Sequence, residues 1–325
     1  MPRRTALVSH PACALHDTGW GHPEHQGRLP AVVKALYRAT PELQDHVLQE
    51  EARPASVPDL LRVHTSAHVE TVRAAAERAG ARGQPLDLTL DTVVSGASWD
   101  AALGAAGAAV AAVRLVLAGQ GPATAFALTR PPGHHATASR AMGFCLFNNV
   151  AVAARWAQAE GGLDRVLIVD WDVHHGNGTQ DIFYHDPSVY YLSLHLSGHY
   201  PGTGHVHETG IGAGEGTTRN VPFPAHVERE HYLEVFREAL VAATSSFRAD
   251  LVLVSAGFDC LAGDPLGGLR LEPVDLHAMT RAIVDAAAVS AGGRVVALLE
   301  GGYVPRRVGE GVVQVVRAFA GLPAD

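Results

Sequence analysis

Hydrophobic residues occur along this chain in short aliphatic runs that alternate with longer segments of helical periodicity. Such a run is typical of a strand buried on both faces of a parallel sheet. The runs predict strands at residues 5–9, 124–129, 166–170, 189–195, 251–255 and 295–300. The amphipathic segments predict helices at residues 30–38, 66–79, 98–117, 148–160, 229–246 and 273–290. This alternation predicts an α/β fold with a single, mostly parallel sheet and helices on both faces.

Composition limits the classes of protein that this chain can belong to. At 325 residues and 47% hydrophobic, it can bury a large core, and no linker or repeat divides it. We therefore expect one domain over residues 1–325. Its 25 Lys and Arg against 33 Asp and Glu give a net charge of −8. Because no basic stripe is present, we expect no nucleic-acid partner.

Three features indicate a cytoplasmic protein without a membrane partner. The cysteines, Cys13, Cys145 and Cys260, are scattered and odd in number, which predicts reduced thiols. No long apolar segment follows the arginines of residues 1–7, so we expect no signal peptide. The apolar stretch 101–113 is shorter than the roughly 20 residues that span a bilayer, and it predicts an internal helix.

Polar, Gly-rich or His-rich segments follow four of the predicted strands, at residues 130–135, 170–178, 255–259 and 300–303. Ligands of open parallel sheets bind outside the carboxyl ends of the strands. One such segment alone is ordinarily a turn or a helix cap. Four of them at the same edge predict a functional site, and residues 170–178, Asp-Trp-Asp-Val-His-His-Gly-Asn-Gly, carry the densest chemistry.

A metal site is the first prediction from these segments. Asp172 and His174 are two residues apart, so in extended backbone they point to the same side. With Asp259 they supply three ligands and leave a position for water, as in catalytic zinc sites. Two carboxylates and one imidazole are harder donors than the usual zinc set, so Fe²⁺ or Mn²⁺ also fit.

Proton-transfer groups surround this predicted metal site. His134 and His135 lie in a stiff Pro-Pro-Gly loop and can serve as general base and general acid. Asp170 can accept the outer N–H of one of them and hold its tautomer. Tyr303 follows two glycines and can donate its O–H to a developing oxyanion. Together these residues predict hydrolysis of a carbonyl compound.

These motifs, in this order, resemble the histone deacetylase superfamily, which includes acetylpolyamine amidohydrolases, acetoin-utilisation proteins and bacterial deacetylase homologues. The matching motifs are spread over nearly the whole chain, at residues 22–24, 28, 130–135, 143–149, 170–179, 193–195, 201–204, 255–259, 264–267 and 300–303. The resemblance implies the arginase/deacetylase fold. It also implies a zinc enzyme that removes an acetyl group from acetyl-lysine or a related acetylated amine.

The resemblance assigns further roles to single residues. The implied zinc ligands are Asp172, His174 and Asp259, and the implied catalytic residues are His134, His135 and Tyr303, with Asp170 and Asn177 beside them. The implied substrate-site residues are Phe144 and Tyr200 along an acyl-lysine channel, Gly143, Asp91 and Leu266 with them, and Arg28 near an inner cavity for acetate. The implied potassium ligands are Asp170, the carbonyls of Asp172 and His174, Ser193 and Leu194.

Within the superfamily, the sequence of residues 22–24 and 170–179 resembles class II more than class I. Asn177 stands where class I has an aspartate expected to pair with the second histidine. An amide polarises His135 less than a carboxylate does, so it stays open which histidine is the acid. Tyr303 is retained where weakly active class IIa members carry histidine, which favours an active enzyme.

The substrate is the least determined part of this interpretation. Leu266 stands where the polyamine-specific branch carries a glutamate, which favours acetyl-lysine peptides over acetylpolyamines. A polyamine preference would then depend on other acidic residues around the mouth, such as Glu24 or Asp91. The composition favours a prokaryotic enzyme whose target is not histone, and the oligomeric state stays open.

Two other functions are compatible with the same fold. A noncatalytic acyl-lysine reader would have lost a metal ligand or the tyrosine, and neither loss is present. An arginase-like ureohydrolase with two manganese ions needs further aspartates, but one of the expected bridging positions is Trp171 or Val173, so a single-metal site fits better.

Overall fold

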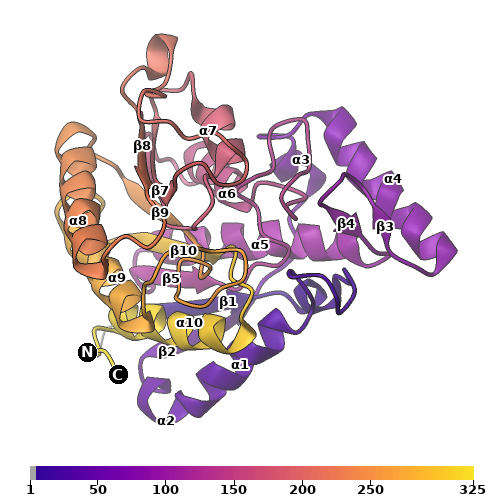
Figure 1. Cartoon of the computed structure of the whole chain (residues 1–325), viewed down its shortest axis with the longest axis horizontal. Helices are drawn as coiled ribbons and strands as arrows, with labels where there is room; N and C mark the ends of the chain where they lie inside the picture. The colour runs from indigo at the N-terminus through magenta and orange to yellow at the C-terminus, as the bar shows by residue number, and fades with distance from the viewer. Residues whose placement is uncertain (1–4) are drawn as a thin grey trace.

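Eight strands form one sheet in which every neighbouring pair is parallel, in a computed structural model that describes residues 5–325 (Figure 1). From one edge to the other the strands are β2 (Val47–Glu51), β1 (Thr5–Ser9), β5 (Thr124–Ala127), β10 (Val295–Leu299), β9 (Leu251–Ala256), β6 (Val166–Asp170), β7 (Val189–Leu196) and β8 (Thr218–Phe223). The prediction of a single parallel sheet is confirmed. A short antiparallel hairpin, β3 (Leu86–Asp87) with β4 (Val93–Val94), stands apart from it.

Helices cover both faces of this sheet. They are α1 (Arg28–Arg38), α2 (Thr40–Leu43), α3 (Val57–Leu60), α4 (Ser66–Arg82), α5 (Ser98–Leu117), α6 (Asn149–Ala159), α7 (Asn177–Phe183), α8 (Arg229–Ser246), α9 (Pro273–Ser290) and α10 (Pro305–Ala320). In Figure 1, α8 and α9 lie at one side of the molecule, whereas α4 and the β3–β4 hairpin project at the other. Residues of α8, α9 and α10 pack in one core cluster and residues of α5 and α6 in another, so the prediction of helices on both faces is confirmed.

The two faces explain why the central strands are hydrophobic without interruption. Successive side chains of a strand point to opposite faces. Leu167 and Val169 of β6 pack with residues of α8, α9 and α10, whereas Val166 and Ile168 pack with residues of α5 and α6. A strand covered on both sides needs apolar residues at every position, which is why β6 reads Val-Leu-Ile-Val before its terminal aspartate.

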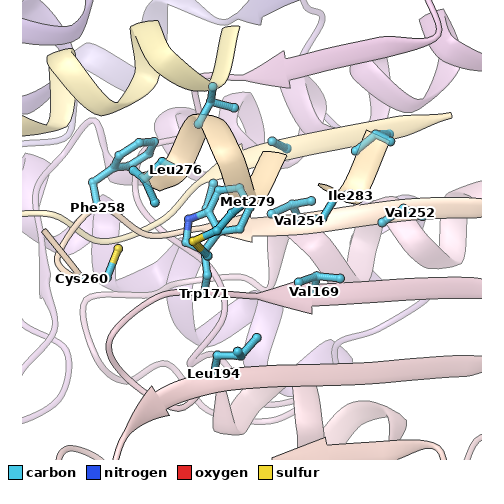
Figure 2. Close-up of a cluster of buried hydrophobic side chains, with 14 of the residues drawn as sticks. Val169, Trp171, Leu194, Val252, Val254, Phe258, Cys260, Leu276, Met279 and Ile283 are labelled. Carbon is cyan, nitrogen blue, oxygen red and sulfur yellow. The ribbon is translucent and has the colours of Figure 1, made fainter. Parts of the chain in front are cut away.

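The larger core extends under the carboxyl ends of the strands. Figure 2 shows Trp171 lying among Val254, Met279 and other apolar side chains of β9 and α9. Trp171 is fully buried, and its indole N–H donates to the carbonyl of Gly257 at 3.0 Å. The residue between Asp170 and Asp172 therefore anchors the turn after β6 in the core.

Among the elements that the sequence analysis did not predict, three have a physical reason for their weak sequence pattern. Strands β2 and β8 are the edges of the sheet, where one side needs no strand partner, and β8 contains Pro222. Helix α10 contains Gly309, Gly311 and several valines, which lowers its intrinsic helix propensity. A Cβ at Gly309 would lie 2.8 Å from the Cβ of Ala35, so the close approach of α10 to α1 favours glycine there.

The apolar helix α5 corrects one expectation about length. The whole helix has 20 residues and is long and apolar enough to cross a bilayer, so the argument that the stretch is too short was wrong. However, 67% of its most apolar window is buried, and the helix packs against β1 and β5 as the predicted internal helix. The expectation about a signal peptide includes residues 1–4, which lie outside the described residues.

Candidate active site

The predicted metal ligands meet at the carboxyl ends of β6 and β9. Asp172 and His174 lie in the turn after β6, and Asp259 lies three residues beyond β9. Their ligand atoms all lie within 4.8 Å of one another, and all three side chains are buried. Two carboxylates and an imidazole in this arrangement have the donor atoms and the spacing that one divalent cation requires.

The hydrogen bonds around the two carboxylates leave one oxygen without a partner. Asp172 accepts the backbone N–H groups of His174 and Gly301, each at 2.9 Å, and Asp259 Oδ1 accepts that of Val173 at 2.9 Å. Asp259 Oδ2 is buried and has no hydrogen-bond partner of good geometry among residues 5–325, and Nδ1 of His174 lies 3.3 Å from it. Burial and the negative charge of Asp172 raise the pKa of Asp259 to about 7. A cation bound at this position would compensate the cost of burying two neighbouring carboxylates.

The two adjacent histidines have different partners. His134 Nδ1 lies 3.1 Å from Asp170 Oδ2, which also accepts the hydroxyl of Tyr191 at 2.9 Å. Although burial lowers it, the charges of Asp172 and Asp170 raise the pKa of His134 to about 10. His135 Nδ1 lies 2.9 Å from Asn177 Oδ1. The two imidazole rings are therefore oriented by a carboxylate and by an amide, respectively.

Burial lowers the pKa of both histidines, but at His135 no carboxylate charge outweighs this effect. Burial lowers the pKa of His135 well below the ordinary value, and the neighbouring His134 and His174 add to this effect. The ring centroids of His134 and His135 are only 4.0 Å apart. The structure thus places one histidine that favours the protonated form beside one that favours the neutral form.

Glu300 supports the histidine loop, and the sequence analysis gave it no role. Its Oε2 accepts the backbone N–H groups of Gly133 at 2.6 Å and of His134 at 3.2 Å. Burial raises the pKa of Glu300 to about 7. Its position directly after β10 was the only signal in the sequence.

A cavity of about 210 Å³ leads from the surface to these residues. It is lined by Asp91, His135, Gly143, Phe144, His174, His199, Tyr200, Leu266 and Tyr303. The structure therefore brings together five of the six residues predicted to contact substrate, from four separate loops. The exception is Arg28.

Aromatic rings form the walls of this cavity. Phe144 lies edge-on to Tyr303 with centroids 5.8 Å apart, and Tyr200 lies edge-on to His135 at 5.0 Å. Gly143 and Phe144 both have positive φ angles, of 57° and 67°. A Cβ at Gly143 would lie 2.3 Å from the ring of His135, so this loop can pass the histidine only with glycine there.

His199 is a site residue that the sequence analysis missed. Its ring stacks on His174 with centroids 5.0 Å apart and an angle of 20°. Its Nε2 lies 2.8 Å from the carbonyl oxygen of Leu266. Only its position next to Tyr200 could have indicated this role.

Arg28 lies behind Tyr303, and it does not line the cavity. Its guanidinium is 5.4 Å from the centre of the Tyr303 ring. Glu24, expected near the mouth, is instead fully buried and accepts Arg28 at 2.9 Å and Arg130 at 2.7 Å. The expectation that Glu24 can select substrates at the mouth was wrong, because two arginines neutralise it in the interior.

The residues implied for potassium come from the end of β6, the turn after it and the neighbouring strand β7. Asp170, the last residue of β6, is the register partner of Ser193 within β7, and Leu194 follows Ser193. Asp170 is completely buried, and burial raises its pKa. With the carbonyls of Asp172 and His174 nearby in the chain, a potassium site at this position stays a prediction.

Comparisons with known proteins agree with this geometry. The profile of the histone deacetylase domain family matches residues 22–319. Histone deacetylase 10, chloroplastic, of Oryza sativa subsp. japonica is 41% identical, with 93% of this chain and 70% of the relative covered. The histone deacetylase-like amidohydrolase of Pseudomonas aeruginosa is 38% identical, with 93% and 82% covered.

A solved structure shows the same architecture. The crystal structure of the HDA15 HD domain superposes with a TM-score of 0.91 at 38% identity, covering 99% of this chain and 90% of that one. The chain therefore has the arginase/deacetylase fold. This chain belongs to the histone deacetylase family and is a hydrolytic deacetylase.

Proposed function

We propose that residues 1–325 form one catalytic domain, a zinc-dependent amidohydrolase that removes an acetyl group from acetyl-lysine or a related acetylated amine. The observation that carries this proposal is the buried cluster of ligand atoms from Asp172, His174 and Asp259 at the inner end of an aromatic-walled cavity. Fe²⁺ or Mn²⁺ would suit the same donors.

A divalent cation held by Asp172, His174 and Asp259 would polarise the acyl carbonyl and lower the pKa of a bound water. The protein groups then handle the protons. A cation on Asp172 would offset part of the negative charge that raises the pKa of His134. In the neutral form His134 donates its Nδ1–H to Asp170, and its Nε2 would accept a proton from the attacking water. His135 donates Nδ1–H to Asn177, so its Nε2 also faces the reaction. Which of the two delivers the proton to the leaving amine stays open.

Tyr303 supplies the remaining electrostatic element. It lines the cavity opposite Phe144, and its backbone N–H donates to Asp264 at 2.7 Å, which positions the residue after two glycines. Its hydroxyl would donate to the oxyanion that forms when water adds to the carbonyl. The C–N bond then breaks, the amine takes a proton from a histidine, and acetate is released.

The cavity favours a slender acyl-amine stem. Methylene groups pack well between aromatic faces such as those of Phe144 and Tyr200. The cavity wall has the apolar Leu266, which cannot pair with a second ammonium group. The carboxylate of Glu24 is buried and therefore cannot reach such a group either. We therefore favour acetyl-lysine peptides over acetylpolyamines as substrates. A cytoplasmic location, a prokaryotic source and structural K⁺ on Asp170, Ser193 and Leu194 complete this proposal.

The other two functions are less well supported by the site. A noncatalytic reader would not need His134, His135 and Tyr303 together with a complete ligand set. An arginase-like site needs a second set of carboxylates, but Trp171 and Val173 are fully buried in the apolar core. A single-metal hydrolytic site therefore fits better.

The test is a substrate panel on the purified protein with its metal content measured. The panel compares an acetyl-lysine peptide, acetylputrescine, acetylspermidine and longer acyl-lysine peptides at equal concentrations. We expect one divalent ion per chain and the highest kcat/KM for the acetyl-lysine peptide. Metal-loaded protein that turns over none of these compounds would overturn the proposed function.

A further inference from the structure

The carboxylate of Asp91 at the cavity mouth is already engaged by this protein's own groups. Its Oδ1 accepts the hydroxyls of Thr89 and Thr92, each at 2.9 Å, and its Oδ2 accepts the hydroxyl of Tyr200 at 2.7 Å. The backbone N–H of Gly143 is a further hydrogen-bonding neighbour. An ionised carboxylate offers about four acceptor positions. Asp91 therefore keeps little capacity for a cation or an amide of a substrate.

These hydrogen bonds join three loops that are distant in the sequence. Thr89, Asp91 and Thr92 lie between β3 and β4, and Tyr200 lies 109 residues later, after β7. Thr92 Oγ1 also accepts the backbone N–H of Phe144 at 3.2 Å. Asp91 thus connects the loops that carry Phe144 and Tyr200, the two aromatic walls of the cavity.

The loop of Tyr200 is also held from its other side. The neighbouring His199 hydrogen-bonds the carbonyl of Leu266 at 2.8 Å. Residues 199–200 are consequently tied both to the β3–β4 hairpin and to the loop after β9. A series of hydrogen bonds, from Asp91 to Tyr200 and from His199 to Leu266, therefore links three loops at the mouth.

We propose that the hydrogen bond from Tyr200 to Asp91 holds the ring of Tyr200 in the cavity wall, and that it makes Tyr200 a specificity-determining residue that admits slender acyl-amine stems and rejects ring-bearing ones. This inference rests on the proposed function. A tyrosine ring has only two side-chain torsions, and a hydrogen bond at its far end restricts both. Without that bond the ring can swing outward, because Tyr200 is 36% exposed and lies at the surface.

Tyr200→Phe tests the proposal because it keeps the ring and removes only the hydroxyl. Two peptides of one sequence serve as substrates: one carries acetyl-lysine, and the other carries 4-(acetylaminomethyl)phenylalanine, which puts a ring in the stem. We expect KM for the acetyl-lysine peptide to rise about three- to tenfold, the factor that one net hydrogen bond provides. We expect kcat to change less than about twofold and the ring-bearing peptide to gain at least about threefold relative to the linear one.

Tyr37→Phe is the matched control, because Tyr37 is 78% exposed on α1. Asp91→Ala removes the same hydrogen bond from the other side, so the double variant with Tyr200→Phe should resemble the stronger single variant. Thermal unfolding of each variant establishes that it is folded.

Two results would overturn the inference while wild-type turnover of the acetyl-lysine peptide upholds the proposed function. One is a selectivity ratio in Tyr200→Phe within about twofold of wild type. The other is additive effects of Tyr200→Phe and Asp91→Ala. Wild-type protein that is loaded with metal but inactive on both peptides instead refutes the proposed function itself.

Discussion

The inner end of the cavity and its mouth are built in different ways. At the inner end, Asp172, His174 and Asp259 are buried and lie within a few residues of strand ends. At the mouth, Tyr200 is partly exposed, and hydrogen bonds between long loops hold it in place. The first region depends on the sheet, whereas the second depends on how the loops meet.

This difference predicts different sensitivities to substitution. Removing one partner of a buried charge cluster leaves the others uncompensated, which costs several kcal/mol. A partly exposed hydrogen bond contributes only about 0.5–1.5 kcal/mol net. Changes at the inner end should therefore abolish the reaction, whereas changes at the mouth should alter the choice of substrate.

The largest effect is expected for Asp259→Asn. The amide oxygen can still accept the N–H of Val173, so the metal-free fold should be retained. The loss of one ligand charge should abolish both metal binding and turnover. Metal stoichiometry after dialysis and a peptide deacetylation assay measure the two effects, with the exposed Asp285→Asn as control. Full metal occupancy with near-normal turnover would show that Asp259 is not a ligand.

Tyr303→Phe should have the next largest effect. It removes an oxyanion donor but keeps the ring that packs against Phe144. Loss of one such donor costs about 10²–10³ in kcat. Metal content and the thermal midpoint should stay at wild-type values, and steady-state kinetics measure the loss. A decrease below tenfold would mean that the hydroxyl contributes little to the transition state.

Asn177→Asp should give an intermediate effect that sharpens the assignment of the two histidines. A carboxylate that accepts the Nδ1–H of His135 stabilises the imidazolium, so the pKa of His135 should rise. The limb of the pH–kcat/KM profile that reports His135 should move to higher pH. If activity at pH 7 falls, His135 works in its neutral form, and if it rises, His135 works as the acid. If neither limb of the pH–kcat/KM profile moves, the titration of His135 does not limit activity in the measured pH range.

The smallest effect is expected at the mouth, for Leu266→Glu. A carboxylate at this position of the cavity wall can pair with the second ammonium group of a polyamine. The ratio of kcat/KM for acetylspermidine to that for the acetyl-lysine peptide should rise. The increase should correspond to the free energy of a partly exposed ion pair, which is about 0.2–1 kcal/mol. Leu269→Glu is not a suitable control because Leu269 is buried, so Leu61→Glu on the surface serves instead. A wild-type preference for acetylspermidine of tenfold or more would contradict the role of Leu266.

Much of the inner end of the site could be predicted from short sequence spacings. The geometry of a strand decides that Asp172 and His174 face the same side, and the carboxyl ends of parallel strands meet at one edge. These rules placed Asp259, His134, His135 and Tyr303 at the same edge before any contact was known. The central strands were equally clear, because burial on both faces demands uninterrupted apolar residues.

Only the tertiary structure decided the contacts between distant loops and the environment of the single charges. The partner of Asp91 lies 109 residues away in the chain, and no local spacing encodes such a pair. Glu24 looked like a surface carboxylate, but Arg28 and Arg130 neutralise it in the core. Backbone geometry acts between near neighbours and can be read from the sequence, whereas a hydrogen bond between loops depends on how the whole chain packs.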